Sequence, residues 1–180
     1  MEVKSKEKKL KKTPVKCKVR LVGDSNARGL GAMLQTDSTD TIVLTNPGAE
    51  TDRLRKQAVQ RWDEDVLILM GGTNDIRNKT NPAPGILTTV DKVATAHPDR
   101  RVFVVEIPPD PKHRRDVRHM NNRLRDKCNK YRNVIFLETG LRSDQMQGVH
   151  MNTLGKWQVA LRIRNRTDSF FINKNLQYLT

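Results

Sequence analysis

The chain alternates short apolar stretches of strand length with longer stretches in which apolar residues recur at helical spacing. The candidate strands are Cys17–Val22, Thr41–Leu44, Val66–Met70, Val102–Ile107 and Val134–Leu137. The third and fourth contain unbroken apolar runs, which are typical of strands covered on both faces of a sheet. The first is the weakest prediction, because Lys18 and Arg20 make it alternate between apolar and polar positions.

The segments between these strands have helical periodicity. A helix is predicted from about residue 27 to residue 35, although Gly29 and Gly31 weaken it. Asn81-Pro82 and Asn152 are of the residue types that begin helices. The apolar residues that share one face of each later helix are Leu54, Ala58 and Trp62; Ile86, Val90, Val93 and Ala94; Val117, Met120, Leu124, Cys128 and Tyr131; and Leu154, Trp157 and Leu161.

Strand and helix therefore alternate five times along the chain. This order predicts an α/β fold, a three-layer α/β/α sandwich whose five-stranded parallel sheet is connected by right-handed crossovers. The predicted domain covers residues 17–168. It lies between a basic leader at residues 1–16, which we expect to be disordered, and a C-terminal tail at residues 169–180.

The charge is strongly positive, with 34 Lys and Arg against 20 Asp and Glu and a formal net charge of +14. Most of the excess lies in two tracts, residues 4–20 and residues 112–132. Each tract is a candidate contact for nucleic acid or anionic lipid. The first tract is equally well interpreted as a solubilising tail, and the second as the solvated face of a helix.

Several classes of protein are disfavoured. Cys17 and Cys128 are far apart in the sequence, which argues against a disulfide scaffold and a structural zinc site, and we expect no metal or other cofactor. His97, His113 and His119 are interpreted as surface residues. No apolar run approaches the roughly 20 residues of a membrane span, and the lysine-rich start does not resemble a secretory signal. The expected location is intracellular, either cytoplasmic or nuclear.

Four polar loops follow strands of the predicted sheet. They are Gly23–Asn26, Asn46–Glu50, Gly71–Asp75 and Gln147–Asn152. In a parallel sheet with helices on both faces, binding sites form at the carboxyl ends of the strands. We therefore expect these four loops to meet at one edge of the sheet.

Together these loops offer the groups that acyl transfer requires. Ser25 would act as a nucleophile at a strand-to-helix turn, and His150 would accept its proton and return it to the leaving group. The backbone N–H groups of Ser25 and Gly48 and the amide of Asn74 would stabilise the oxyanion. Each residue also has a simpler interpretation: Ser25 as a helix cap, Asn74 as a turn residue and His150 as a surface histidine.

These blocks resemble the SGNH (GDSL) hydrolase superfamily. That family has Gly-Asp-Ser near its N-terminus, a lone glycine, Gly-x-Asn-Asp, and Asp-x-x-His near its C-terminus. The corresponding positions here are Gly23–Ser25, Gly48, Gly72–Asp75 and His150. The resemblance implies a flavodoxin-like fold, an esterase acting on a small or lipid-like acyl ester, and the site roles given above. It also implies that the aspartates of the first and third blocks are structural.

The sequence departs from this family at Gln147, where the catalytic acid would stand. A glutamine can orient the imidazole, but it cannot supply the negative charge that stabilises an imidazolium. Asp144 is a possible substitute if the loop curls back. We therefore expect either a Ser25–His150 dyad of reduced activity or a domain that has lost its chemistry and binds nucleic acid through its basic surface.

A closer resemblance lies in the residues within and beside these blocks. Gly23–Gly29, Asn46–Ala49 and Gly148–Asn152 are similar to the esterase domains carried by non-LTR retrotransposon proteins. This resemblance implies that one chain could use an acyl site and a basic surface for different steps.

Overall fold

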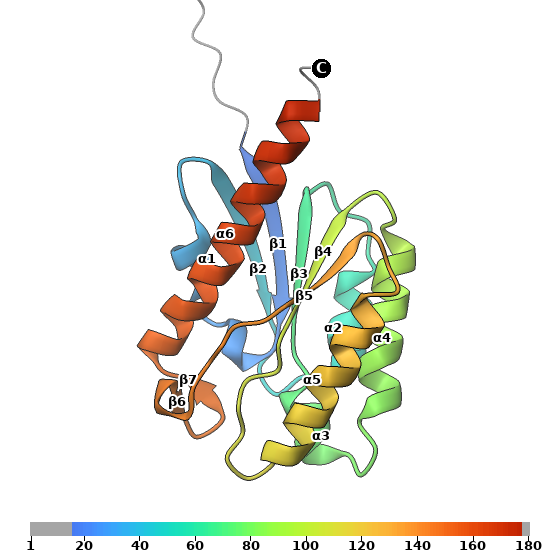
Figure 1. Ribbon diagram of the computed structural model, residues 1–180, viewed down its shortest axis with the longest axis vertical. Helices are drawn as coiled ribbons and strands as arrows, with labels where there is room; N and C mark the ends of the chain where they lie inside the picture. The colour runs from blue at the N-terminus through green and yellow to red at the C-terminus, as the bar shows by residue number, and fades with distance from the viewer. Residues whose placement is uncertain (1–15, 178–180) are drawn as a thin grey trace, which may run out of the picture.

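Within residues 16–177, the part of the chain that the computed structural model describes, five parallel strands form the expected sheet (Figure 1). They are β1 (Cys17–Gly23), β2 (Thr39–Thr45), β3 (Val66–Met70), β4 (Arg101–Val105) and β5 (Val134–Leu137). Their order across the sheet is β2-β1-β3-β4-β5, and each neighbouring pair runs parallel. This flavodoxin-like order confirms the predicted fold class.

Helices cover both faces of the sheet. One face is covered by α1 (Leu30–Leu34) and α6 (Thr153–Gln177), which contact each other. The other is covered by α2 (Thr51–Ala58), α4 (Ala83–Ala96) and α5 (Arg114–Cys128), as Figure 1 shows. The remaining elements are short: the 3₁₀ turns η1 (Ser25–Ala27) and η2 (Ser143–Gln145), α3 (Thr73–Asn78), and the hairpin of β6 (Met146–Gln147) and β7 (His150–Met151).

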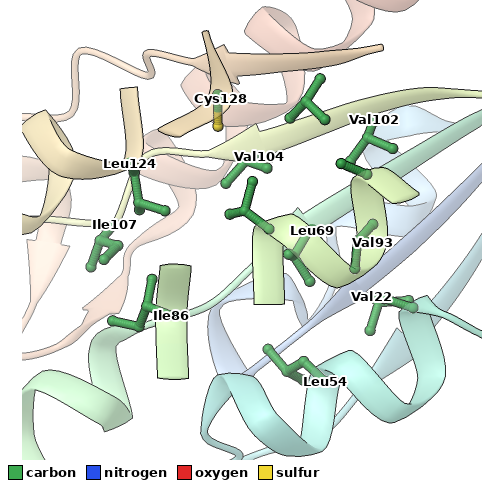
Figure 2. Close-up of a cluster of buried hydrophobic side chains, with 14 of the residues drawn as sticks. Val22, Leu54, Leu69, Ile86, Val93, Val102, Val104, Ile107, Leu124 and Cys128 are labelled. Atoms are coloured by element: carbon green, nitrogen blue, oxygen red, sulfur yellow. The ribbon is translucent and has the colours of Figure 1, made fainter. Parts of the chain in front are cut away.

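The core consists of two apolar layers on opposite sides of the sheet. All five residues of β3 are buried, as its unbroken apolar run predicts. Figure 2 shows the layer beneath α2, α4 and α5, in which Leu69 and Val104 of the sheet lie near Ile86, Leu124 and other helix residues. The second layer lies beneath α1 and α6 and includes Leu21, Ile68, Phe103 and Ile163. Burial of both sheet faces fixes the strand ends that carry the polar loops.

The sheet topology determines where the loops meet. The chain moves from β1 outward to β2, and then returns across β1 to β3. The connections after β1 and β3 therefore leave the sheet on opposite faces, and the carboxyl edge between them is the topological switch point at which ligands bind in such sheets. Ser25 follows β1 and Asn74 follows β3, so both lie at this switch point.

Two segments differ from their predicted secondary structure. The expected helix at residues 27–35 is interrupted at Gly29, whose φ of +82° leaves η1 before the break and α1 after it. A left-handed residue cannot continue a right-handed helix. The glycine-rich segment after β3 was predicted as a loop, but it begins α3 at Thr73, with Gly72 at φ +114° as the preceding residue.

The prediction for the buried face of α6 is wrong. Leu154, Trp157 and Leu161 are 58%, 51% and 55% exposed. The helix instead buries a second row that includes Gly155 and Val159. A Cβ on Gly155 would lie 2.5 Å from the Gln145 carbonyl oxygen, so only a glycine permits this close approach of α6 to η2. Close backbone packing, which apolar periodicity does not report, selects the buried face.

The ends of the predicted domain also differ from the structure. α6 continues through residue 168, and Phe170 and Phe171 pack against the core, so residues 169–177 extend the helix rather than form a separate tail. Except for Lys16, the predicted basic leader lies outside the described residues. In the part of the chain that is described, no helix is both long enough and apolar enough to cross a membrane.

His97 is not the free surface histidine that the sequence predicts. The Trp62 indole N–H donates to His97 Nε2 at 2.7 Å, and the two rings lie 4.6 Å apart between centroids. Burial lowers the pKa of His97, which favours the neutral ring that this bond requires. Trp62 itself lies beyond the end of α2 but remains buried.

Candidate active site

The loop that carries Ser25 is packed tightly against the end of the sheet. A Cβ on Gly23 would lie 2.6 Å from the Ala27 Cβ, so glycine allows the chain to turn immediately after β1. The Asp24 N–H donates to the Met70 carbonyl at 3.1 Å, and this bond ties the loop to β3. Ser25 then begins η1 with its side chain only partly buried. The fold therefore presents the serine hydroxyl at the surface on a fixed backbone.

Asp24 acts on the structure of this loop and not on the serine hydroxyl. Its side chain is 1% exposed and accepts the Asn26 N–H at 2.9 Å. Burial raises the pKa of Asp24 to about 6, partly offset by the bond from Asn26. Asp24 therefore caps η1, which agrees with the structural role that the resemblance implies.

The β6–β7 hairpin brings His150 to Ser25. Gly148 turns this hairpin with φ +65°, and His150 is the first residue of β7. The Ser25 Oγ lies 3.3 Å from the His150 Nδ1, within hydrogen-bond distance. For Nδ1 to accept the serine proton, the neutral ring must carry its own proton on Nε2. The nucleophile and base predicted from sequence are therefore brought together.

Asn26 holds the hairpin, and sequence reasoning missed this role. Its Nδ2 donates to the Val149 carbonyl at 3.2 Å, and its Oδ1 accepts the Met151 N–H at 3.0 Å. The side chain is 2% exposed and binds the backbone on both sides of His150. Its position next to Ser25 was the only sequence signal.

The two remaining loops supply hydrogen-bond donors. Gly48 has φ +72°, and the N–H groups of Ser25 and Gly48 donate to no residue within the described chain. The Asn74 Nδ2 donates to the Ala49 carbonyl at 3.0 Å, which uses one of its two amide hydrogens. A Cβ on Gly48 would meet nothing within 4 Å, so space is open beside this turn.

A buried carboxylate connects these two loops. Asp75 is fully buried, and its oxygens accept the Thr51 N–H at 2.9 Å and the Thr51 hydroxyl at 2.8 Å. The Lys79 ammonium lies 3.4 Å from Asp75 and 2.8 Å from Glu50, and its bond to Glu50 raises the pKa of Lys79. These contacts fix the loops that carry Gly48 and Asn74 relative to each other.

Neither Gln147 nor Asp144, the two positions considered for the catalytic acid, brings a carboxylate to the imidazole of His150. Gln147 is the antiparallel partner of His150 in the hairpin, but its exposed side chain makes no hydrogen bond to a described residue. The Asp144 carboxylate pairs with Arg142 at 3.0 Å, so the structure does not bring this possible substitute to His150. Within residues 16–177, no group of three or more His, Cys, Asp or Glu side chains is placed to hold a metal ion.

The geometry at the switch point thus agrees with the family that the sequence blocks resemble. The chain belongs to the GDSL-like lipase/acylhydrolase family, whose model matches residues 19–158. This match includes the Ser25, Gly48, Asn74 and His150 loops. A comparison with curated proteins found no match to the sequence.

Solved structures with this fold include several esterases. A carbohydrate esterase of family 3 from Talaromyces cellulolyticus has a TM-score of 0.73 at 17% identity, over 87% of this chain and 99% of that chain. A family 3 carbohydrate esterase from Clostridium thermocellum has a TM-score of 0.67 at 17% identity, over 83% and 94%. The C-terminal catalytic domain of the Streptococcus pneumoniae peptidoglycan O-acetyltransferase A has 0.66 at 13%, over 87% and 95%. At these identities, the likeness establishes the fold alone.

Proposed function

We propose that this protein is a serine ester hydrolase in which Ser25 is the nucleophile and His150 is the general base and acid. The observation that carries the proposal is the distance of 3.3 Å between the Ser25 Oγ and the His150 Nδ1. A hydroxyl and an imidazole at this separation form the minimal pair for covalent acyl transfer. Membership of an acylhydrolase family supports the same chemistry.

The reaction would proceed in two halves. The Ser25 Oγ attacks the acyl carbon while the His150 Nδ1 takes its proton, and the alcohol leaves with that proton as the tetrahedral intermediate collapses. Water then attacks the acyl-serine, Nδ1 takes a proton from it, and the carboxylic acid leaves as the proton returns to Ser25. The N–H groups of Ser25 and Gly48 and the amide of Asn74 would donate to the oxyanion, each worth roughly 2.7–4 kcal/mol.

The preferred substrate would be a short acyl ester of a bulky alcohol. Ser25 and His150 meet at the surface, and the open space beside Gly48 leaves room for an extended alcohol group. An esterase of carbohydrates and an O-acetyltransferase share the fold, which supports an acetyl-sized group. We expect the rate to be lower than that of a complete triad, because Gln147 provides no charge. A place within a retrotransposon protein stays a prediction.

The test is turnover of 4-nitrophenyl acetate together with labelling by a fluorophosphonate. We expect hydrolysis above background and a single phosphonylated residue, Ser25, identified by mass spectrometry of the digested protein. Ser25→Ala should lose both, whereas Ser169→Ala, which removes an exposed hydroxyl on α6, should lose neither. Equal hydrolysis by the parent protein and Ser25→Ala would show that the dyad is not catalytic.

A further inference from the structure

A basic groove borders the open edge of the sheet, and neither Ser25 nor His150 is among its lining residues. The first part is a hollow of 680 Å³ over β5, lined by Arg125 of α5 and by Arg162 and Arg166 of α6. The second part is a hollow of 450 Å³ beside α5, lined by Arg114, Arg118 and the same Arg125. Arg125 lines both hollows, and we call the two hollows together the arginine groove.

The carboxylates that line this groove are already engaged. Glu138 pairs with Arg125 at 2.7 Å, and Asp110 pairs with Arg77 at 3.2 Å. Glu106 accepts the N–H and the hydroxyl of Thr139 at 2.8 and 2.9 Å. Glu106 keeps its charge in these bonds, so the groove retains one carboxylate without an ion pair against four arginines without one.

Four of the five arginines have no internal partner. Arg114, Arg118, Arg162 and Arg166 are exposed and form no ion pair with any residue of the described chain. Guanidinium groups bind phosphate through two parallel hydrogen bonds, and they are less strongly hydrated than lysine ammonium groups. The groove thus presents an excess of the side chain best suited to phosphate.

We propose that the arginine groove binds single-stranded nucleic acid through its phosphates. Arg114, Arg118 and Arg125 follow one side of α5 over about 16 Å, at about 1.5 Å per residue, so several successive phosphates can be contacted. A positively charged groove that follows the backbone is the usual means of binding single strands without sequence preference. A flat lipid surface fits less well, because these arginines line two hollows rather than a protruding face.

Protection of the sheet edge does not account for the whole groove. β5 pairs only with β4 among the described strands, and charged side chains commonly shield such an edge from another strand. Arg125, Arg162 and Arg166 fit that role. Arg114 and Arg118 do not, because they line the second hollow, which β5 does not reach. An added peptide strand fits less well, because its hydrogen bonds would be limited to β5 and would leave Arg114 and Arg118 unused.

The test measures binding of a fluorescein-labelled 20-nucleotide oligouridylate by anisotropy, with the full chain at 50–300 mM salt. The double variant Arg162→Gln/Arg166→Gln should bind about tenfold more weakly at 100 mM salt. Its salt slope should fall by about 1.4, since each phosphate contact on a single strand contributes about 0.7. Arg118→Gln should reduce the slope by about half as much. Thermal melting confirms that the variants remain folded.

The matched control is Arg53→Gln/Arg61→Gln, which removes the same charge from exposed positions outside the groove. Residues 1–15 contribute equally to every variant, so they cannot produce a difference between the two pairs. The proposal is overturned if both pairs lose the same affinity or if binding is independent of salt. It is also overturned if the groove variants lose binding only to phosphatidylserine vesicles or to polyglutamate.

Discussion

Ser25 and His150 meet from two loops that are built in opposite ways. Ser25 lies between Asp24 and Asn26, which are 1% and 2% exposed, and its loop is bonded to the neighbouring strand. His150 is exposed and lies on a two-residue strand of a small hairpin. The proposed nucleophile is thus positioned by the protein interior, whereas the proposed base is positioned at the surface.

This difference indicates which property of the site would limit the proposed activity. Asn26 fixes the backbone before and after His150, but no described carboxylate fixes the ring. A correct backbone brings the imidazole within reach of the Ser25 hydroxyl without selecting its tautomer or ring orientation. In complete triads a carboxylate performs that selection. We therefore expect the chemistry to depend on His150, and the efficiency to depend on how well its ring is held.

The largest expected effect comes from removing the base. His150→Ala should lower kcat/KM for 4-nitrophenyl acetate by about 10³-fold, or about 4 kcal/mol, because the serine proton has no other acceptor at 3.3 Å. His119→Ala, on the exposed side of α5, should retain the parent rate. If His150→Ala loses less than threefold, the two loops do not form a catalytic pair.

Asp24, which is buried in the Ser25 loop, predicts a pH effect on stability. Asp24 has its ordinary pKa of 3.8 when unfolded and a pKa of about 6 when folded, so the folded state holds more protons between these values. The free energy of unfolding should therefore fall as the pH rises from below 4 to above 6, by about 3 kcal/mol in all.

Asp24→Asn isolates this effect, because the asparagine Oδ1 can still accept the Asn26 N–H. Urea unfolding at pH 4, 5, 6 and 7 should show that the stability of the variant relative to the parent rises across this window. A constant difference at all four values would mean that the burial of Asp24 does not penalise its charge.

Asn26 connects the two loops, so its replacement should separate positioning from stability. Asn26→Leu removes both hydrogen bonds to the hairpin and should lower kcat by about 30-fold, or about 2 kcal/mol, with little change in KM. This pattern follows because the substrate still binds beside Ser25 while His150 is no longer held.

The matched control for this change is Asn121→Leu. Asn121 is also buried, and it donates to the Ile107 carbonyl and accepts the Ile107 N–H at 3.0 and 2.9 Å. Loss of two such bonds should destabilise both variants by a few kcal/mol. A similar fall of kcat in both variants would show that Asn26 acts only on stability and does not position His150.

The sequence was sufficient for the sheet and for bringing together the two candidate reacting groups. Unbroken apolar runs mark β3 and β4, and the residues after β1 and β3 meet because parallel strands share a carboxyl edge. Ser25 and His150 could therefore be paired although they are 125 residues apart. These features depend on periodicity and topology, which a single sequence records.

Other features depend on close contacts that a single sequence does not record. The buried face of α6 follows from the approach of Gly155 to the Gln145 carbonyl, and the apolar row of Trp157 pointed to the wrong side. The role of Asn26 needs the backbone of Val149 within 3.2 Å. Both are contacts between segments distant in sequence, so spacing within one helix or loop could not reveal them.

The smallest expected effect tests the exposed hairpin that carries His150. Gln147→Asp would place a carboxylate on the strand partner of His150, where it can bind Nδ1 once the ring turns Nε2 toward Ser25. We expect kcat/KM to rise about tenfold, or about 1.4 kcal/mol. The gain is far below the roughly 10⁴-fold effect of a triad aspartate, because the pair is exposed to solvent and the ring must reorient.

Gln147→Ala should change the rate by less than about twofold, since the Gln147 side chain makes no hydrogen bond to a described residue. A large loss in Gln147→Ala would instead show that the glutamine itself orients the imidazole during the reaction, and that the base is held more firmly than its exposure indicates.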